Sequence, residues 1–218
     1  MLIVDLHLKG NLVIVIGSGN EGMKKVSSLL TQDCEILVIS SSSNPQITKY
    51  VKQGKIKFKK IKLKDASFLS KYKPYLVMAA TTDRVLNRKI VENATNMKSY
   101  AYASDDPEAS DFAHPSVINI ADTVQIAIST GGSSPAMARK IKLKAESYFK
   151  NNISNEEIFQ IRLQKFARSE AKLIIKTQIE RKKFLYSILN DKRVKELLKD
   201  EKYKQAQTRV KKMLKEWL

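Results

Sequence analysis

The chain has 218 residues and carries 40 Lys and Arg against 22 Asp and Glu, which gives a formal charge of +18. Its one cysteine excludes a disulfide scaffold and a cysteine-built zinc site, and its two histidines are too few for a histidine metal cluster. No apolar run reaches the roughly 18–20 residues of a membrane span, and the N-terminus lacks the pattern of a signal peptide. We therefore expect a cytoplasmic protein without a metal site and without a membrane partner.

The first 105 residues alternate short apolar runs with helical stretches, which is the pattern of a parallel α/β sheet. We expect five strands, at Leu12–Ile16, Glu35–Ile39, Ile56–Ile61, Leu76–Ala80 and Ser99–Ala103. Helices are expected from the end of the first strand to Leu30 and over Gln46–Gln53, Ala66–Tyr72 and Val85–Thr95. This order predicts an N-terminal Rossmann-like domain over residues 1–112.

Residues 113–150 follow a different pattern. Two strands, Val117–Ile120 and Val124–Ile128, are expected with no helix between them, and a helix is expected after them. Ser134 and Pro135 mark the start of this helix, because a hydroxyl cap followed by proline at the first helical position favours helix initiation. The region is expected to fold as a small α+β unit.

Residues 151–218 are expected to form an all-helical C-terminal domain. From Ser154 onward there is neither Gly nor Pro, and apolar residues recur at spacings of three and four. This domain contains 18 basic and 9 acidic side chains, while residues 1–150 contain 22 and 13, so the positive charge is spread along the chain. Such an excess is typical of proteins that bind nucleic acid or small polyanions, but a lysine-rich surface in water gives the same numbers.

A glycine-rich turn directly follows the first strand. Its sequence is Gly17-Ser18-Gly19-Asn20-Glu21-Gly22, with the spacing G-x-G-x-x-G. In dinucleotide-binding folds the first glycine allows the tight turn, the second lets the main chain approach a pyrophosphate, and the third lets helix and strand pack closely. The N-terminus of the following helix adds free N–H groups and a partial positive charge. We therefore predict a dinucleotide site at these six residues; the alternative is a tight turn on a sheet without a ligand.

The end of the second strand bears on the choice of cofactor. About 20 residues after the turn, NAD-binding proteins of this kind have an acidic residue that binds the adenosine ribose. Here the sequence has Ser40–Ser43, whose hydroxyl groups can bond a ribose or tolerate a phosphate. No arginine stands nearby to bind the 2′-phosphate of NADP, and Lys49 and Lys52 lie further on. We therefore expect NAD as the cofactor.

A hydroxyl-rich segment precedes the helix that starts at Pro135. Hydroxyl groups, a helix N-terminus and an arginine one turn inside the helix suit carboxylate groups. We therefore predict a substrate site at Ser129, Thr130, Ser133, Ser134 and Arg139. The alternative is a hydroxyl-rich helix cap without a ligand.

Five blocks of the sequence occur together in the order and spacing of one known family. They are Asp5–Gly10, GSGNEGMKK at 17–25, AATTDRVLN at 79–87, SDDPEASDFAHPS at 104–116 and ISTGGSSPAMAR at 128–139. Through these blocks, about residues 1–150 resemble the precorrin-2 dehydrogenase and sirohydrochlorin ferrochelatase family, the N-terminal module of sirohaem synthases. The last two blocks are the specific ones, since any dinucleotide-binding domain could supply the first.

The resemblance implies an NAD-dependent oxidation of precorrin-2 to sirohydrochlorin in sirohaem biosynthesis, followed in some members by iron insertion, a lyase activity. It also implies a homodimer, with residues 113–150 as the dimerisation region. Precorrin-2 is an anionic tetrapyrrole, which suits a chain with a charge of +18. The family's catalytic aspartate falls on Asp105. Its nicotinamide cofactor contacts fall on Asn20, Glu21, Ser41, Ser42, Thr81 and Thr82, and its serine-rich strand end falls on Ser129 and Thr130.

Two residues of the fourth block have a simpler interpretation when they are taken alone. Asp105 and Asp106 before Pro107 are typical turn formers, and the resemblance reassigns only Asp105 to catalysis. His114 is a further candidate for substrate contact, although a histidine before proline is usually a loop residue.

A competing hypothesis is a dinucleotide-sensing regulatory or nucleic-acid-binding module. It would use the glycine turn as a sensor and the basic helices as a contact surface. The basic residues of the helical segment are mostly Lys, with few aromatic residues between them, so a nucleic-acid partner is not favoured. This hypothesis also leaves Asp105 and the hydroxyl-rich segment without a role.

Overall fold

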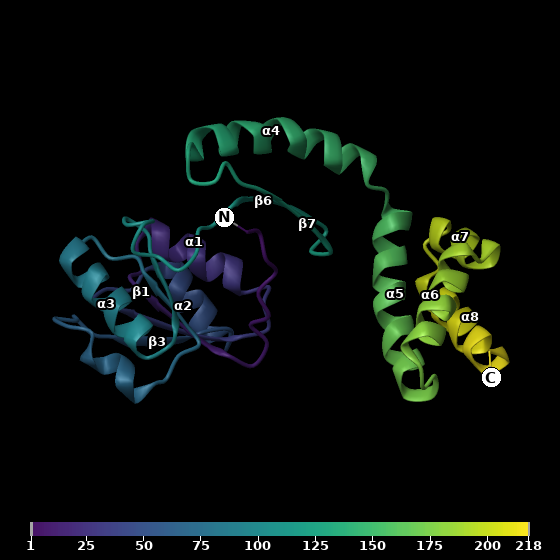
Figure 1. The fold of residues 1–218 in the computed structure, drawn as a ribbon, viewed down its shortest axis with the longest axis horizontal. Coiled ribbons are helices and arrows are strands. Elements are labelled where there is room, and N and C mark those ends of the chain that lie inside the picture. The colour runs from purple at the N-terminus through teal and green to yellow at the C-terminus, as the bar shows by residue number, and fades with distance from the viewer. Residues whose placement is uncertain (1, 218) are drawn as a thin grey trace. The chain divides into compact units, whose positions relative to one another are not determined.

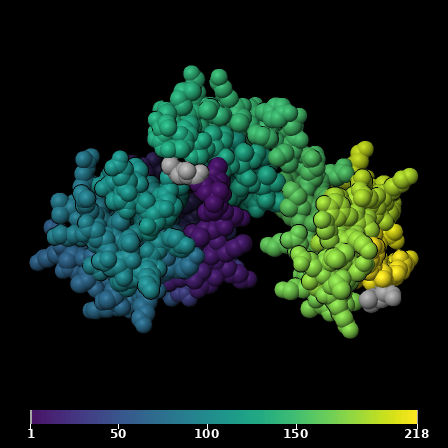
Figure 2. Space-filling view, in the orientation of Figure 1, coloured from purple at the N-terminus to yellow at the C-terminus, as the bar shows by residue number. Residues whose placement is uncertain are grey.

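In the computed structural model, which describes residues 2–217, the chain divides into two compact units (Figure 1). The first, called the sheet unit below, contains the residues up to Pro115 together with Gly131–Ser133. The second, called the helical unit, contains Ser116–Thr130 and the residues from Ser134 onward. In the space-filling view of Figure 2, residues of the sheet unit gather in one closely packed body, and residues from about 155 onward gather in another.

Five parallel strands form the core of the sheet unit, in the order β3-β2-β1-β4-β5. They are β1 (Leu12–Ile16), β2 (Glu35–Ser40), β3 (Lys57–Lys60), β4 (Leu76–Ala79) and β5 (Tyr100–Ala103). All five match predicted runs, so the Rossmann-like fold class is confirmed. The chain runs from β1 to β2 on one side and crosses to β4 on the other. The carboxyl ends of β1 and β4 therefore border the point at which such sheets bind ligands.

Alternate side chains of β1 fill the two faces of the sheet. Val13 and Val15 pack on the face covered by α1 (Asn20–Leu29) and α2 (Pro45–Lys52). Ile14 and Ile16 pack on the other face, which α3 (Arg84–Asn96) covers. All four side chains are at most 1% exposed, as expected for a strand buried on both faces.

The predicted helix over residues 66–72 is a short 3₁₀ helix, Ser67–Lys71. The Asp65 carboxylate accepts hydrogen bonds from the main-chain N–H and the hydroxyl group of Ser67, which fixes the start. At the other end Lys73 has a left-handed φ of 47° directly before Pro74. Because neither residue continues a helix, the segment remains a single short turn.

The helical unit begins with the predicted hairpin and the helix that packs on it. β6 (Ser116–Ile120) and β7 (Val124–Ile128) are antiparallel, and the turn between them has left-handed φ at Ala121 and Asp122. α4 (Pro135–Asn152) starts as predicted, because the Ser134 side chain accepts a hydrogen bond from the main-chain N–H of the third helical residue. Apolar side chains of the hairpin and of α4 form a common cluster.

Four further helices complete the helical unit: α5 (Asn155–Ile174), α6 (Gln178–Asn190), α7 (Lys192–Lys199) and α8 (Tyr203–Glu216). Their core includes Leu163, Phe184 and Ile188, none of which is exposed, and the predicted all-helical segment is confirmed. Side chains of Thr177 and Asp191 cap α6 and α7, so polar caps rather than Gly or Pro divide the segment. Within residues 2–217 no helix is both long enough and apolar enough to cross a membrane.

Candidate functional site

The glycine turn between β1 and α1 is closed at two of its glycines and open at the third. Gly17 has a left-handed φ of 108°, and a Cβ added there would collide with the carbonyl oxygen of Ala80. A Cβ at Gly22 would collide with the carbonyl oxygen of Gly17. A Cβ at Gly19 would meet nothing within 4 Å. The first and third glycines therefore serve packing, while the second leaves the main chain accessible to a ligand.

The start of α1 is the natural anion site of the sheet unit. Its N-cap is Gly19, which offers no side chain, whereas Asn44 caps α2 and Asp83 caps α3 by accepting main-chain hydrogen bonds. The N–H groups in the first turn of α1 therefore lack a side-chain cap within the described chain, and they carry the positive end of the helix dipole. Together with the open space at Gly19, they fit the pyrophosphate of a dinucleotide.

The serine-rich end of β2 is hydrogen-bonded to the glycine turn. The Ser18 hydroxyl lies 2.9 Å from the Ser40 hydroxyl and donates to the Ser42 carbonyl oxygen at 2.7 Å. The Asn44 amide donates to the Ser18 carbonyl oxygen at 2.8 Å. Ser18 is only 8% exposed, so its side chain holds the turn in place, while the side chains of Ser41 and Ser42 are exposed. A ribose at this edge would therefore meet hydroxyl groups rather than a carboxylate.

Asn87 of α3 joins the end of β4 to Asp105. This amide is 1% exposed. Its Oδ1 accepts hydrogen bonds from the Thr81 hydroxyl at 2.7 Å and from the Thr81 main-chain N–H at 3.2 Å. Its Nδ2 donates to the Thr81 carbonyl oxygen at 3.1 Å and to Asp105 Oδ1 at 2.9 Å. A Cβ added at Gly17 would lie only 3.2 Å from the Thr81 nitrogen, so Thr81 stands close to the glycine turn. The hydrogen bonds of Asn87 therefore connect the glycine turn with Asp105.

Asp105 follows β5 at the carboxyl edge of the sheet. Its side chain is 22% exposed, and its second oxygen, Oδ2, lies 3.9 Å from Nε of Arg84. One carboxylate oxygen is thus held by a buried amide, and the other lies beside the exposed Arg84 side chain; a carboxylate in this position is a candidate proton acceptor. Asp106 has the role of a turn former, since its Oδ1 accepts a hydrogen bond from the Ala109 N–H at 3.1 Å.

A buried lysine lies beside the strand that leads to Asp105. Lys25 of α1 is 8% exposed, its Nζ donates to the Tyr102 hydroxyl at 3.2 Å, and it lies 4.3 Å from the Tyr102 ring centroid. Burial lowers the pKa of Lys25 to about 8, although the Glu21 charge opposes the shift. Burial also raises the pKa of Tyr102, and the charges of Glu21 and Asp105 raise it further.

His114 packs in the same cluster. Its ring centroid lies 4.8 Å from that of Tyr102 and 5.4 Å from that of Phe112, both in edge-on contacts. The aromatic neighbours desolvate the His114 ring and the Lys25 charge lies nearby, and both effects lower the pKa of His114, although the residue as a whole is exposed. The imidazole is therefore neutral at pH 7, and a substrate would meet an uncharged ring there.

The hydroxyl-rich segment closes on itself before α4. The Thr130 hydroxyl donates to the Ser134 carbonyl oxygen and accepts from the Ser134 N–H, both at 3.1 Å. The segment turns through left-handed φ values at Gly131 and Gly132, 63° and 85°. The side chains of Ser133 and Arg139 are exposed. The hydroxyl groups of Thr130 and Ser134 thus shape the loop, and the exposed side chains are those that can reach a ligand.

The sequence analysis left two polar residues of the sheet edge without a role. They are Asn87 and Lys25. Each lies on the apolar face of its helix: Asn87 is one turn from the buried Ile90, and Lys25 is one turn from the buried Leu29. A single polar side chain at a buried helical position is the signal that could have found them.

The predicted residues on the glycine turn, at the ends of β2 and β4 and at Asp105 lie at one edge of the sheet. Thr130, Ser134 and Arg139 belong to the helical unit.

Comparisons with known proteins agree with this organisation. A family model described as "Putative NAD(P)-binding" matches residues 4–116, and one described as "Sirohaem biosynthesis protein central" matches residues 122–144. The chain belongs to the family of the sirohaem synthase N-terminal module. The resemblance drawn from the five sequence blocks is thereby confirmed.

Individual relatives extend the likeness along the chain. A siroheme synthase of Neisseria meningitidis is 26% identical over 208 residues, which cover 95% of this chain and 42% of that protein. A siroheme synthase of Thioalkalivibrio sulfidiphilus is 32% identical over 145 residues, which cover 66% of this chain and 29% of that protein. The chain therefore spans less than half the length of these curated relatives.

A solved structure has the same fold over nearly the whole chain. It is "SirC, precorrin-2 dehydrogenase", with a TM-score of 0.64 and 19% sequence identity, covering 97% of this chain and all of that one. The likeness supports the fold assignment of both units, including the helical C-terminal part.

Proposed function

We propose that the chain is an NAD-dependent precorrin-2 dehydrogenase that forms sirohydrochlorin in sirohaem biosynthesis. The observation that carries the proposal is the Asn87 amide, which holds the Asp105 carboxylate at 2.9 Å while it also holds the Thr81 loop beside the glycine turn. A proton acceptor is thus fixed at the edge where a nicotinamide cofactor would bind. Membership of the sirohaem synthase family and the fold shared with a precorrin-2 dehydrogenase support the choice of reaction.

The cofactor would lie along the carboxyl edge of the sheet. The main chain at Gly17, Gly19 and Gly22 and the first turn of α1 suit its pyrophosphate. The exposed hydroxyl groups at the end of β2 suit its ribose, and the absence of an arginine there favours NAD over NADP. When bound, NAD supplies a hydride acceptor. The full set of proposed cofactor contacts is Gly17, Ser18, Gly19, Asn20, Glu21, Gly22, Ser41, Ser42, Thr81 and Thr82.

Asp105 would accept the proton that precorrin-2 releases as its hydride leaves. Asn87 holds one carboxylate oxygen in place, and the other, which lies beside Arg84, would meet the substrate. Arg84 Nε lies 3.9 Å from Oδ2, the carboxylate oxygen that would receive the proton.

The carboxylate arms of the tetrapyrrole would meet hydroxyl and cationic groups. Ser133 and Arg139 are exposed and can donate to carboxylates, and Ser129, Thr130 and Ser134 complete the proposed contacts. His114 would contact the substrate as a neutral ring. We further propose a homodimer, with residues 113–150 as the dimerisation region, and a cytoplasmic location, both by analogy with the family.

A direct assay tests this function. Purified protein is incubated with precorrin-2 and either NAD or NADP, and the absorbance of the reduced cofactor is followed together with the spectrum of sirohydrochlorin. We expect equal amounts of NADH and sirohydrochlorin, and slower turnover with NADP. Absence of NADH formation by folded protein that binds NAD would refute the proposed reaction. A sequence-dependent, salt-resistant complex with DNA or RNA would instead support the regulatory alternative.

Ferrochelatase activity at the same carboxylate is a second candidate. The accessible Oδ2 of Asp105 could also accept the pyrrole protons that are displaced when a metal ion enters the macrocycle. The test adds ferrous ion to sirohydrochlorin with and without protein. Sirohaem formation faster than the spontaneous rate supports the second activity, and an unchanged rate leaves a dehydrogenase alone.

A further inference from the structure

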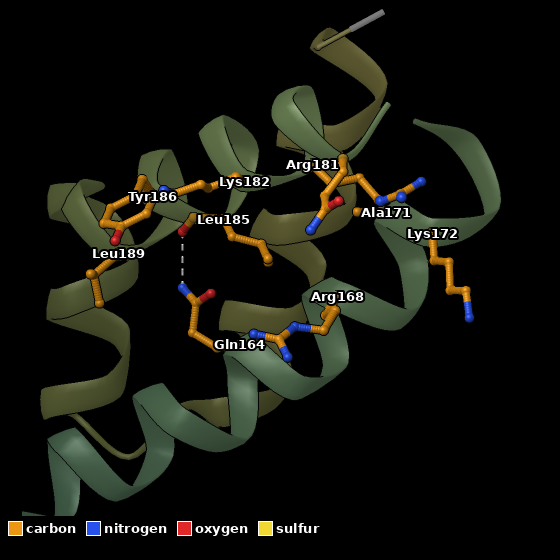
Figure 3. Close-up of a pocket in the computed structure, with 10 residues that line it drawn as sticks. Gln164, Arg168, Ala171, Lys172, Arg181, Lys182, Leu185, Tyr186 and Leu189 are labelled. Carbon is orange, nitrogen blue, oxygen red and sulfur yellow. Dashed lines mark hydrogen bonds between the residues drawn. The ribbon is translucent and has the colours of Figure 1, made fainter. Parts of the chain in front are cut away.

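A groove of about 720 Å³ lies between α5 and α6 of the helical unit (Figure 3). Its volume falls within the range of about 300–1,000 Å³ that is typical of small-molecule sites. The groove belongs to one unit and none of its lining residues is among those assigned above to cofactor or substrate.

Two polar bridges hold the groove open. At one end the Gln164 amide of α5 donates to the Leu185 carbonyl oxygen of α6 at 3.1 Å, as the dashed line in Figure 3 shows. Toward the other end Arg181 donates to the carbonyl oxygens of Ile175 and Lys176 at 2.8 and 3.0 Å, which ties α6 to the end of α5. Between these bridges the two helices are fixed relative to each other, so the groove is preformed.

The rim of the groove is basic, and most of its charges are not neutralised within the chain. Arg168 and Lys172 come from α5 and Lys182 from α6, and no acidic residue lines the groove. Over residues 2–217, none of these three side chains forms an ion pair. The neighbouring carboxylates are already engaged, Glu170 with Lys211 and Glu180 with Lys183. Three cations thus remain available to an external anion.

One stretch of α6 gives the groove an apolar wall. Leu185, Tyr186 and Leu189 line it, and Figure 3 shows these side chains along the groove. Tyr186 is 55% and Leu189 is 39% exposed, so apolar surface is left in contact with water. A ligand that covers this surface would gain hydrophobic free energy in addition to its charge contacts.

We propose that the α5–α6 groove binds a planar organic polycarboxylate, with carboxylates at the basic rim and an apolar ring body on Leu185, Tyr186 and Leu189. Among such anions, the choice of a tetrapyrrole rests on the proposed function. A polynucleotide fits less well, because it needs a basic track with several stacking side chains, whereas this groove offers one aromatic residue. Guanidinium groups such as Arg168 bind carboxylates through paired hydrogen bonds.

The test titrates the full-length protein with uroporphyrin III, an octacarboxylate porphyrin, in the absence of NAD. Trp217 is the only tryptophan and contacts Phe184 of α6, so quenching of its fluorescence reports binding to the helical unit. The variant Arg168→Gln/Lys172→Gln should bind about tenfold more weakly, since it loses two charge contacts. The control Lys192→Gln/Lys204→Gln removes the same charge from exposed lysines on α7 and α8 and should stay within about twofold of wild type.

The outcomes separate this site from the proposed reaction. Equal affinity in the groove variant and wild type overturns the proposal, and so does an equal loss in the control, which would indicate unspecific attraction. Tighter binding of a short single-stranded oligonucleotide that competes with uroporphyrin and depends on Arg168 and Lys172 would overturn it in favour of nucleic acid. Binding that persists in a protein without dehydrogenase activity would remove the proposed reaction and leave the groove intact.

Discussion

The carboxyl edge of the sheet unit and the α5–α6 groove hold their polar side chains in opposite ways. At the sheet edge the polar groups satisfy one another: Asn87 bonds Thr81 and Asp105, and Ser18 bonds the end of β2. In the groove, cations such as Arg168 have no carboxylate partner within the described chain. A satisfied network fixes the position of a reacting group, whereas unpaired charges on a rigid wall remain free for a ligand. The variants below test the first half of this contrast.

Substitution of single glycines should have the largest effects on stability and on NAD affinity. Gly17→Ala places a methyl group against the Ala80 carbonyl at a left-handed φ, so we expect the free energy of unfolding to fall by about 3 kcal/mol. Gly19→Ala meets open space, so stability should change by less than about 0.5 kcal/mol. The affinity of Gly19→Ala for NAD should nevertheless fall about tenfold, since the methyl group stands where the pyrophosphate approaches.

Urea denaturation and NAD titration of both glycine variants measure these effects. Equal stability of the two variants would contradict the packing role of Gly17. Unchanged NAD affinity in Gly19→Ala would contradict the placement of the pyrophosphate.

The Asn87 network is the next target. Asn87→Asp keeps the acceptor for the Thr81 hydroxyl but sets a second carboxylate against Asp105 in place of the amide donor. We expect turnover with precorrin-2 to fall about 10–100-fold and its pH optimum to move upward, because two adjacent carboxylates cannot both stay ionised. The measurement is the pH–rate profile of NADH formation.

Asn93→Asp is the matched control, since it makes the same change on the exposed face of α3. It should keep the wild-type profile. If both variants shift the profile alike, the effect comes from net charge and not from the bridge between Asn87 and Asp105.

A smaller effect is expected at the buried cation of the sheet unit. Burial lowers the pKa of Lys25 from 10.5 to about 8. Between these two values the unfolded chain binds more protons than the native state, so the free energy of unfolding should rise with pH. We expect a rise of about 1 kcal/mol between pH 8 and 9.5 in wild type that is absent in Lys25→Met. The raised pKa of Tyr102 keeps that phenol protonated over this range.

Chemical denaturation at several pH values measures the slope. Lys24→Met is the control, because Lys24 is the exposed neighbour on the same helix. If the rise of stability with pH persists in Lys25→Met but disappears in Lys24→Met, the titrating group is Lys24, and the assignment to Lys25 is contradicted.

Most of the fold was predictable because its signals are local. The apolar runs of β1 and β4, the glycine spacing and the Ser134–Pro135 helix start each lie within a few residues and match the structure. The division of the C-terminal helices was less visible, since polar caps at Thr177 and Asp191 mark it without Gly or Pro.

The parts of the site that depend on tertiary contacts were not predictable in detail. Asn87 acts between residues 6 and 18 positions away in the sequence, and no spacing rule connects them. Ser18 was expected as a cofactor contact, and its hydroxyl is engaged with Ser40 and the Ser42 carbonyl. The groove forms only where two helices pack together. Nothing in the sequence therefore distinguished its unpaired cations from the many other lysines of a basic chain.

The measurement that tests the account most directly compares cofactor affinity and turnover in Asp105→Asn, using the same protein sample. If the edge of the sheet binds NAD while Asp105 accepts the proton, the dissociation constant for NAD should stay within about twofold and NADH formation from precorrin-2 should fall at least about 100-fold. Turnover at the wild-type rate, or a loss of turnover that merely follows a loss of NAD affinity, would contradict it.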